Sequence, residues 1–278
     1  MQIIKLDATD STNTYLKNLA LLQVLQDFTV VHAHLQYAGR GQRGAEWISD
    51  PGKNLTFSVL KKHRSLPARM QFSITMIVSL GVFSALKQLN VPSLYVKWPN
   101  DILSGNSKIC GMLIENLTSG QHIQSSIVGI GLNVNQLDFK GLQQVSSLRL
   151  LTGQPLDLEE VLQLLLIHLK ESFTKFETAP YAEIRDAYEE LLFRKDKPST
   201  FKNKQGELFM GFIRGVSPEG KLQVELEDEQ LKQFDQDYEA WRNERRQKFS
   251  EEFDKWRSSR PEKTEGSRVS TQADMKNK

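Results

Sequence analysis

Apolar positions along the first 193 residues follow two different periods. Short runs rich in β-branched and aromatic residues predict strands at 2–6, 28–35, 54–61, 94–98, 108–116 and 124–135. Longer stretches with helical spacing predict helices at 13–23, 67–89, 158–176 and 181–193. Both strands and helices are therefore expected in this part of the chain.

Short polar side chains stand where two of these helices begin. Asp10, Ser11 or Thr12 can accept hydrogen bonds from the first turn of the helix at 13–23. Asp157 occupies the same place before the helix at 158–176. We therefore expect local side chains to cap both helices.

The texture of the sequence changes twice after residue 193. Residues 198–228 alternate with period two around turns at 205–206 and 218–220, which predicts a small antiparallel β unit. From residue 236 the chain is highly charged with scattered aromatic residues, and its last stretch has the composition of disordered segments. We predict a catalytic or binding domain at 1–193, a small domain at 194–235 and a charged helical or disordered tail at 236–278.

Composition narrows the class of protein. The net charge of the 278 residues is only +2, which argues against a large nucleic-acid surface. Cys110 is the single cysteine, so no intrachain disulfide is possible and a reducing, cytoplasmic setting fits. The N-terminus lacks the pattern of a signal peptide. The most apolar stretch, MIVSLGVFSAL, is expected to be too short and too polar to span a bilayer.

Residues 39–44 read GRGQRG and match the dinucleotide fingerprint G-x-G-x-x-G literally. That fingerprint requires a helix directly after the glycines, and here a turn at 50–52 and a β-rich segment follow instead. The stretch therefore indicates a glycine-rich loop between two strands. Arg40 and Arg43 make it suited to an anion, although an ordinary hairpin loop has the same pattern.

Polar groups gather in four segments: 10–13, Gln36 with the loop and Trp47, 97–101 with Lys108, and 129–135. Each has a purely structural alternative, namely a helix cap, a packed indole, a solvated surface turn or a close backbone contact. Taken together, the cations, amides and glycines indicate a phosphate-bearing anion held by loops at strand ends. Such a site suits a nucleotide-using transferase or ligase.

The same segments resemble a known family. STN at 11–13, Q-x-x-GRGQRG-x-x-W at 36–47, KWPND at 97–101, KICGML at 108–113 and GIGLNVN at 129–135 resemble biotin–protein ligases, over residues 1 to about 235. The resemblance implies an α/β (α+β) catalytic domain with a mixed sheet, related to class II aminoacyl-tRNA synthetases, followed by a small SH3-like barrel. It implies that biotin reacts with ATP to give biotinyl-5′-AMP, and that a lysine of a biotin carboxyl carrier domain then takes the biotin.

Roles for individual residues follow from this resemblance. Biotin is expected to contact Ser11, Thr12, Asn13, Gln36, Gly39, Arg40, Gly41, Gln42, Lys108 and Gly111. ATP is expected to contact Arg43, Trp47, Lys97, Asn100, Asn133 and Asn135. Arg40, Lys97, Asp101 and Lys108 are the expected catalytic residues. Asp101 is also expected to bind Mg²⁺ and to orient or deprotonate the carrier lysine, whose pKa is ordinarily about 10.

The expected partner is the carrier domain of a biotin-dependent carboxylase, with no nucleic acid and no membrane, and the protein is expected to be a monomer or a homodimer.

The chain starts at the catalytic strand, so we expect no N-terminal DNA-binding domain. Several family members have a basic residue where Gln42 stands and a basic residue or Asn where Ala45 stands, so we expect weaker retention of biotinyl-AMP here. Two alternatives stay open: a lipoate–protein ligase, and a non-catalytic sensor of biotinyl-AMP.

Overall fold

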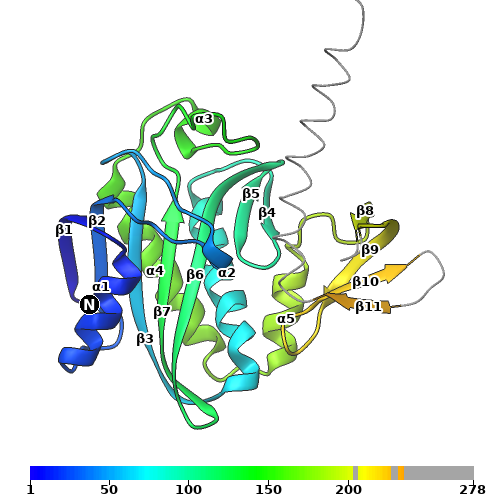
Figure 1. The fold of residues 1–278 in the computed structure, drawn as a ribbon, viewed down its shortest axis with the longest axis horizontal. Coiled ribbons are helices and arrows are strands. Elements are labelled where there is room, and N and C mark those ends of the chain that lie inside the picture. The colour runs from blue at the N-terminus through cyan, green and yellow to red at the C-terminus, as the bar shows by residue number, and fades with distance from the viewer. Residues whose placement is uncertain (203–205, 227–230, 235–278) are drawn as a thin grey trace, which may run out of the picture. The chain divides into compact units, whose positions relative to one another are not determined.

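A seven-stranded mixed sheet forms the centre of the protein (Figure 1). The structure, a computed structural model, describes residues 1–202, 206–226 and 231–234. The strand order is β1-β2-β3-β7-β6-β5-β4, with β1 and β2 parallel and all other neighbours antiparallel. The strands are β1 Ile3–Thr9, β2 Val30–Gln36, β3 Leu55–Pro67, β4 Leu94–Lys97, β5 Asp101–Ser104, β6 Ser107–Ser119 and β7 His122–Leu132.

Helices cover the two faces of this sheet unequally. On one face, α2 (Gln71–Gln88) and α4 (Leu158–Phe176) build the main core, to which β7 contributes Val128 and Ile130. On the other face, α1 (Thr12–Leu22) buries Leu16 against Ile127. Alternate residues of a strand point to opposite faces, so the odd-numbered positions 127, 129 and 131 all belong to the α1 face.

The remaining helices are short. They are α3 (Leu148–Thr152), α5 (Tyr181–Glu189), and the 3₁₀ turns η1 (Gln42–Gly44) and η2 (Ala68–Met70). Asp157 caps α4 as expected, because its Oδ1 accepts from the backbone N–H groups of Glu159 and Glu160 at 2.8 and 3.0 Å.

The expectation for the apolar stretch needs correction. The segment Ala68–Gln88 has a mean hydropathy of 1.4 and is, by length and composition alone, long and apolar enough to cross a membrane. Within the protein, however, 67% of its most apolar 18-residue window is buried, and α2 is the central helix of the main core.

The predicted β unit forms a second, antiparallel sheet of order β11-β10-β9-β8. Its strands are β8 Pro198–Lys202, β9 Leu208–Val216, β10 Leu222–Leu226 and β11 Leu231–Phe234. The turn between β9 and β10 reaches the first sheet, where the buried Trp98 donates through Nε1 to the carbonyl of Gly220 at 2.9 Å. Both sheets therefore belong to one compact unit, Met1–Tyr238.

Several boundaries differ from the expectations. The strand β5 and the helix α3 were not expected, because four or five residues carry too little periodicity to stand out. The helix expected at 67–89 begins only at Gln71, since β3 continues to Pro67. The helix expected at 181–193 ends at Glu189. The tail predicted at 236–278 lies outside the described residues.

Candidate ligand-binding site

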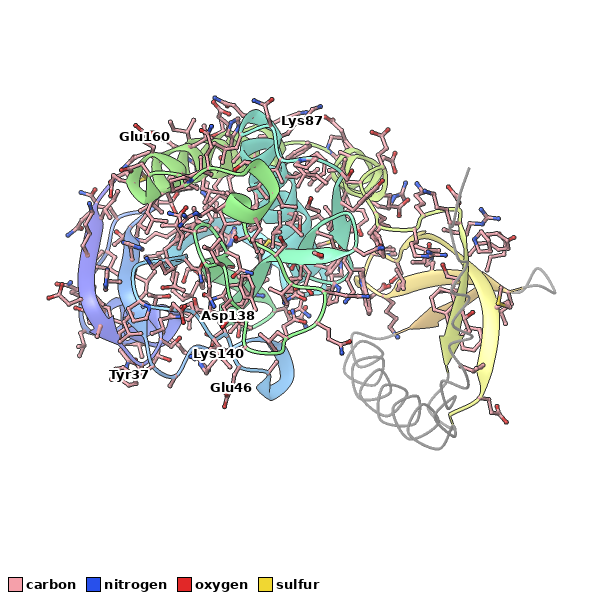
Figure 2. The ribbon with its side chains drawn as sticks, turned by 90° about the horizontal axis from the view of Figure 1, so that it is seen from above. Tyr37, Glu46, Lys87, Asp138, Lys140 and Glu160 are labelled. Carbon is pink, nitrogen blue, oxygen red and sulfur yellow. The ribbon has the colours of Figure 1, made fainter. Side chains whose placement is uncertain are left out.

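A cavity of about 720 Å³ opens on the face of the sheet that carries α1. Gln36 at the end of β2, residues 37–41 and 44–49 of the β2–β3 loop, and Leu113 and Glu115 of β6 line it. In Figure 2 its lining residues Tyr37 and Glu46 lie on the opposite side of the molecule from Lys87 of α2 and Glu160 of α4.

The glycine-rich loop folds into a small hairpin over the cavity. The backbones of Arg40 and Glu46 form an isolated antiparallel β-bridge, and the N–H of Trp47 donates to the carbonyl of Gly39 at 2.9 Å. A Cβ at Gly39 would collide with the Trp47 carbonyl oxygen, so this close approach requires glycine. No helix opens after the glycines beyond the single turn η1, which confirms that this is not a dinucleotide fingerprint.

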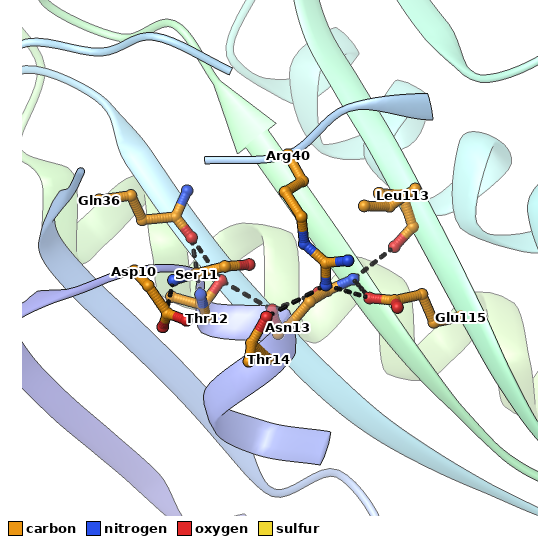
Figure 3. Close-up of polar contacts among 10 residues, drawn as sticks. Asp10, Ser11, Thr12, Asn13, Thr14, Gln36, Arg40, Leu113 and Glu115 are labelled. Atoms are coloured by element: carbon orange, nitrogen blue, oxygen red, sulfur yellow. Dashed lines mark hydrogen bonds and ion pairs between the residues drawn. The ribbon is translucent and has the colours of Figure 1, made fainter. Parts of the chain in front are cut away.

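A polar network connects the start of α1 to the cavity wall (Figure 3). Gln36 Oε1 accepts from the backbone N–H of Thr12 at 2.7 Å and from its hydroxyl at 3.0 Å. Ser58 Oγ lies 2.8 Å from Thr12 Oγ1 and 2.6 Å from Asn13 Oδ1. The expected local cap of α1 is therefore wrong: Ser11, at the N-cap position, makes no side-chain cap bond, and Gln36 supplies the acceptor instead.

The network ends at Glu115 and Arg40. Asn13 Nδ2 donates to Glu115 Oε2 at 2.8 Å and to the Leu113 carbonyl at 3.1 Å. Arg40 Nη2 donates to the same Glu115 oxygen at 3.0 Å and to Thr14 Oγ1 at 3.1 Å. Sequence reasoning missed Glu115 and Ser58, although the period of two along β6 places 111, 113 and 115 on one face.

A second group of polar residues follows the register of four neighbouring strands. Lys97 of β4 pairs with Asp101 of β5, Asp101 with Gly111 of β6, and Gly111 with Gly131 of β7. Lys108 Nζ lies 2.7 Å from Asp101 Oδ1. Three charged side chains and two glycines thus form one continuous row.

The indole of Trp47 lies against this row. A Cβ at Gly131 would stand only 2.7 Å from Trp47 Cδ2, and one at Gly111 would stand 3.2 Å from Cζ3. Lys108 Nζ is 5.8 Å from the ring centroid, within range of a cation–π contact. Trp47 Nε1 is buried and has no hydrogen-bond partner in the described part of the chain. Because Trp47 also lines the cavity, it borders both groups of polar residues.

Comparison with known proteins identifies the family. Residues 6–133 match the model of the Biotin/lipoate A/B protein ligase family. A Biotin--[acetyl-CoA-carboxylase] ligase from Paracoccus denitrificans is 32% identical over 77% of this chain and 90% of its own length. The chain belongs to the biotin–protein ligase family.

Two further relatives agree with this assignment. The biotin protein ligase from Aquifex aeolicus in complex with biotin and ATP superposes with a TM-score of 0.69 at 26% identity, over 84% of this chain and 95% of that one. The Bifunctional ligase/repressor BirA of Bacillus subtilis is 27% identical over 76% of this chain, which spans 66% of that protein's length.

The site residues expected of a biotin–protein ligase fall into two neighbouring groups. Gln36, Gly39, Arg40 and Gly41 line the cavity, and Thr12 and Asn13 stand directly behind them. Ser11 is buried beside Thr12, and Gln42 lies in η1 with the backbone of Arg43. Lys97, Asp101, Lys108 and Gly111 form the second group on the far side of Trp47 and do not line the cavity themselves.

The three asparagines expected at the nucleotide bind the protein backbone. Asn100 Nδ2 donates to the Met112 carbonyl at 2.5 Å, and Asn133 Nδ2 donates to that of Ser146 at 3.0 Å. Asn135 uses its whole amide on Leu156, donating at 2.8 Å and accepting at 2.9 Å. None of the three lines the cavity, and Asn135 is the one whose side chain is fully occupied elsewhere.

Asp101 is the only expected metal ligand. The described residues contain no cluster of three or more His, Cys, Asp or Glu side chains that could hold a metal ion. Mg²⁺ is commonly bound by one or two carboxylates together with substrate phosphates. Asp101 therefore fits an ion that arrives on a triphosphate and gains a single protein ligand.

Cys110, although next to Gly111, offers no nucleophile. Burial raises the pKa of its thiol, so the reactive thiolate does not form at neutral pH.

Proposed function

We propose that the protein activates biotin with ATP to biotinyl-5′-AMP and then transfers biotin to a lysine of a biotin carboxyl carrier domain. The observation that carries this proposal is the junction at Trp47 between an amide- and hydroxyl-lined cavity and a row of charged residues. Biotin--[acetyl-CoA-carboxylase] ligase is the name of the Paracoccus relative, and the Aquifex ligase binds biotin and ATP.

The cavity suits the ring system of biotin. Its ureido group has two N–H donors and one carbonyl acceptor. Gln36 lines the cavity, and Thr12 and Asn13 add hydroxyl and amide groups behind it. Gln36 binds Thr12 directly and Ser58 connects Thr12 to Asn13, so the three side chains have fixed orientations. We assign the bicyclic ring of biotin to this end, with its carboxylate directed toward Arg40.

The reaction requires a carboxylate to approach a triphosphate, so its main obstacle is repulsion between anions. Arg40, Lys97 and Lys108 are the cations that we assign to the carboxylate and to the phosphates. Asp101 would hold Mg²⁺ on the phosphate oxygens, where the ion would offset negative charge. Trp47 offers an aromatic face for adenine and an unpaired N–H for an acceptor of the nucleotide.

In the second step the amine of the carrier lysine attacks the mixed anhydride, and AMP leaves. The amine must first lose a proton. We assign its orientation or deprotonation to Asp101, which is released from Lys108 when that lysine contacts phosphate. The β2–β3 loop that carries Arg40 would exclude water from the anhydride.

Several finer features complete the proposal. The four strands β8 to β11 are antiparallel, and we propose that they form an SH3-like barrel, the small domain expected at 194–235, within the same compact unit as the first sheet. The likeness of the large sheet to class II aminoacyl-tRNA synthetases, the cytoplasmic location and a monomeric or homodimeric state belong to the same proposal.

The direct test is a mass measurement on a purified biotin carboxyl carrier domain incubated with the protein. We expect the mass of one biotin, less one water, to be added only when biotin and ATP are both present. Addition of lipoate in place of biotin would instead favour a lipoate–protein ligase. A protein that binds biotinyl-AMP but releases no pyrophosphate from biotin and ATP would be a sensor.

A further inference from the structure

Glu115 places a negative charge in the wall of a cavity that the proposed function requires to receive anions. Its side chain is 23% exposed and lines the cavity together with Arg40. An unbalanced carboxylate at this place would repel both the carboxylate of biotin and the α-phosphate of the adenylate. Its presence beside Arg40 therefore needs a physical explanation.

The same oxygen of Glu115 serves two neighbours. Oε2 accepts from Asn13 at 2.8 Å and from Arg40 at 3.0 Å, and Figure 3 shows both side chains directed to it. Asn13 has a second anchor in the Leu113 carbonyl. Glu115 thus connects the amide assigned to the ring of biotin with the cation assigned to its carboxylate.

The contact of Arg40 with Glu115 is easily exchanged. Both hydrogen bonds of Arg40 come from Nη2, and within the described residues no group accepts from its Nη1 or Nε. The arginine side chain is 48% exposed, and a partly exposed pair with a single hydrogen bond is weak. An anion that offers two oxygens can therefore replace Glu115 through a bidentate contact.

We propose that Glu115 is a positioning residue that holds Arg40 while the site is free and yields it to the anionic group of the bound ligand. Glu115 keeps its hydrogen bond from Asn13 both without and with the ligand. This inference rests on the proposed function and adds to it a residue that controls how tightly the anion is held. Once Arg40 has moved, the charge of Glu115 faces the ligand's anion and limits its affinity, which favours release of the biotinyl group to the carrier.

The consequence is a dependence on ligand charge. Glu115→Gln keeps an acceptor for Asn13 but removes the negative charge. It should tighten the binding of biotin and leave the binding of biotinamide, an uncharged analogue, unchanged. From the strength of partly exposed ion pairs, we expect the ratio of the two affinities to rise about two- to fivefold.

Isothermal titration calorimetry of wild type and Glu115→Gln with biotin and with biotinamide measures this ratio. The change should shrink at high salt, because salt screens partly exposed charges. Glu115→Ala is the matched control: it also removes the acceptor of Asn13, so both ligands should bind more weakly to it than to Glu115→Gln.

An unchanged ratio in Glu115→Gln would overturn the inference while leaving the proposed function intact. Wild-type protein that binds no biotin would instead overturn the proposed function. A crystal structure of the wild type with biotin gives a second test that needs no variant. We expect Arg40 on the carboxylate of biotin, and an Arg40 that stays on Glu115 would refute the exchange.

Discussion

Two glycines of β7 stand two residues apart on the α1 face, and each makes room for a different part of the site. A Cβ at Gly131 would stand 2.5 Å from Trp47 Cζ2 and 2.7 Å from Cδ2. A Cβ at Gly129 would stand 2.9 Å from Cγ and 3.0 Å from Nδ2 of Asn13. Carbon atoms pack best at about 3.5–4.0 Å, so Gly131→Ala must move the indole by about 1 Å or more.

The two displacements should affect the KM values of different substrates. Stacking of a base on an aromatic side chain contributes about 1–3 kcal/mol, so we expect Gly131→Ala to raise the KM for ATP about tenfold. Gly129→Ala shifts Asn13, and a misplaced buried amide costs about 1–3 kcal/mol. We expect it to raise the KM for biotin about tenfold. Each variant should leave the other KM within about twofold, since the two contacts share no atoms.

Initial rates of pyrophosphate release, measured while one substrate is varied at saturating levels of the other, give both constants. Gly111→Ala is the control, because its added methyl would meet the flexible end of Lys108 at 3.1 Å and the edge of Trp47 at 3.2 Å. Its effect on the KM for ATP should be smaller than that of Gly131→Ala. Melting temperatures identify variants that are merely unstable. If both variants raised the same KM, the assignment of Asn13 to biotin and of Trp47 to ATP would be refuted.

Four further outcomes are expected. Asp101→Asn should slow transfer from supplied biotinyl-AMP to the carrier domain about a hundredfold, and full transfer would remove Asp101 from that step. Gln42→Arg should slow dissociation of biotinyl-AMP at least about tenfold, since a charge-assisted hydrogen bond contributes about 1.5–3 kcal/mol; equal dissociation rates would contradict this. Trp98→Phe leaves the Gly220 carbonyl without its donor and should lower the free energy of unfolding in urea by about 1–3 kcal/mol, so an unchanged value would contradict the role of that bond. Burial, helped by a neighbouring lysine, lowers the pKa of His63 to about 4, below its value of about 6.5 in the unfolded chain. The unfolded state then binds more protons, so stability is lost as pH falls from about 6.5 toward 4; His63→Gln should flatten the melting-temperature curve there, and an unchanged slope would contradict it.

Much of the fold could be predicted from the local pattern of the sequence. The strands β6 and β7 and the cap that Asp157 provides for α4 depend on residues close in sequence, and all three were predicted. The nature of the GRGQRG loop was predicted for the same reason, because the turn residues that follow it exclude a helix.

Contacts between distant segments could not be predicted in this way. The acceptor at the start of α1 is Gln36, 24 residues from Thr12, and it replaces the local cap that sequence favoured. Glu115 meets Asn13 across 102 positions, because β6 lies beside the strand that faces α1. The motifs indicated which residues to expect at the site, but only the contacts of the indole with Gly111, Gly131 and Lys108 show that Trp47 stands between two polar groups.

In the proposed first step, these two groups of residues bring biotin to the α-phosphate of ATP. The most direct measurement is the exchange of labelled pyrophosphate into ATP in the absence of any carrier protein. Exchange should begin when biotin is added, and lipoate should not support it. Exchange that proceeds equally without biotin, or its absence while biotin and ATP both bind, would contradict it.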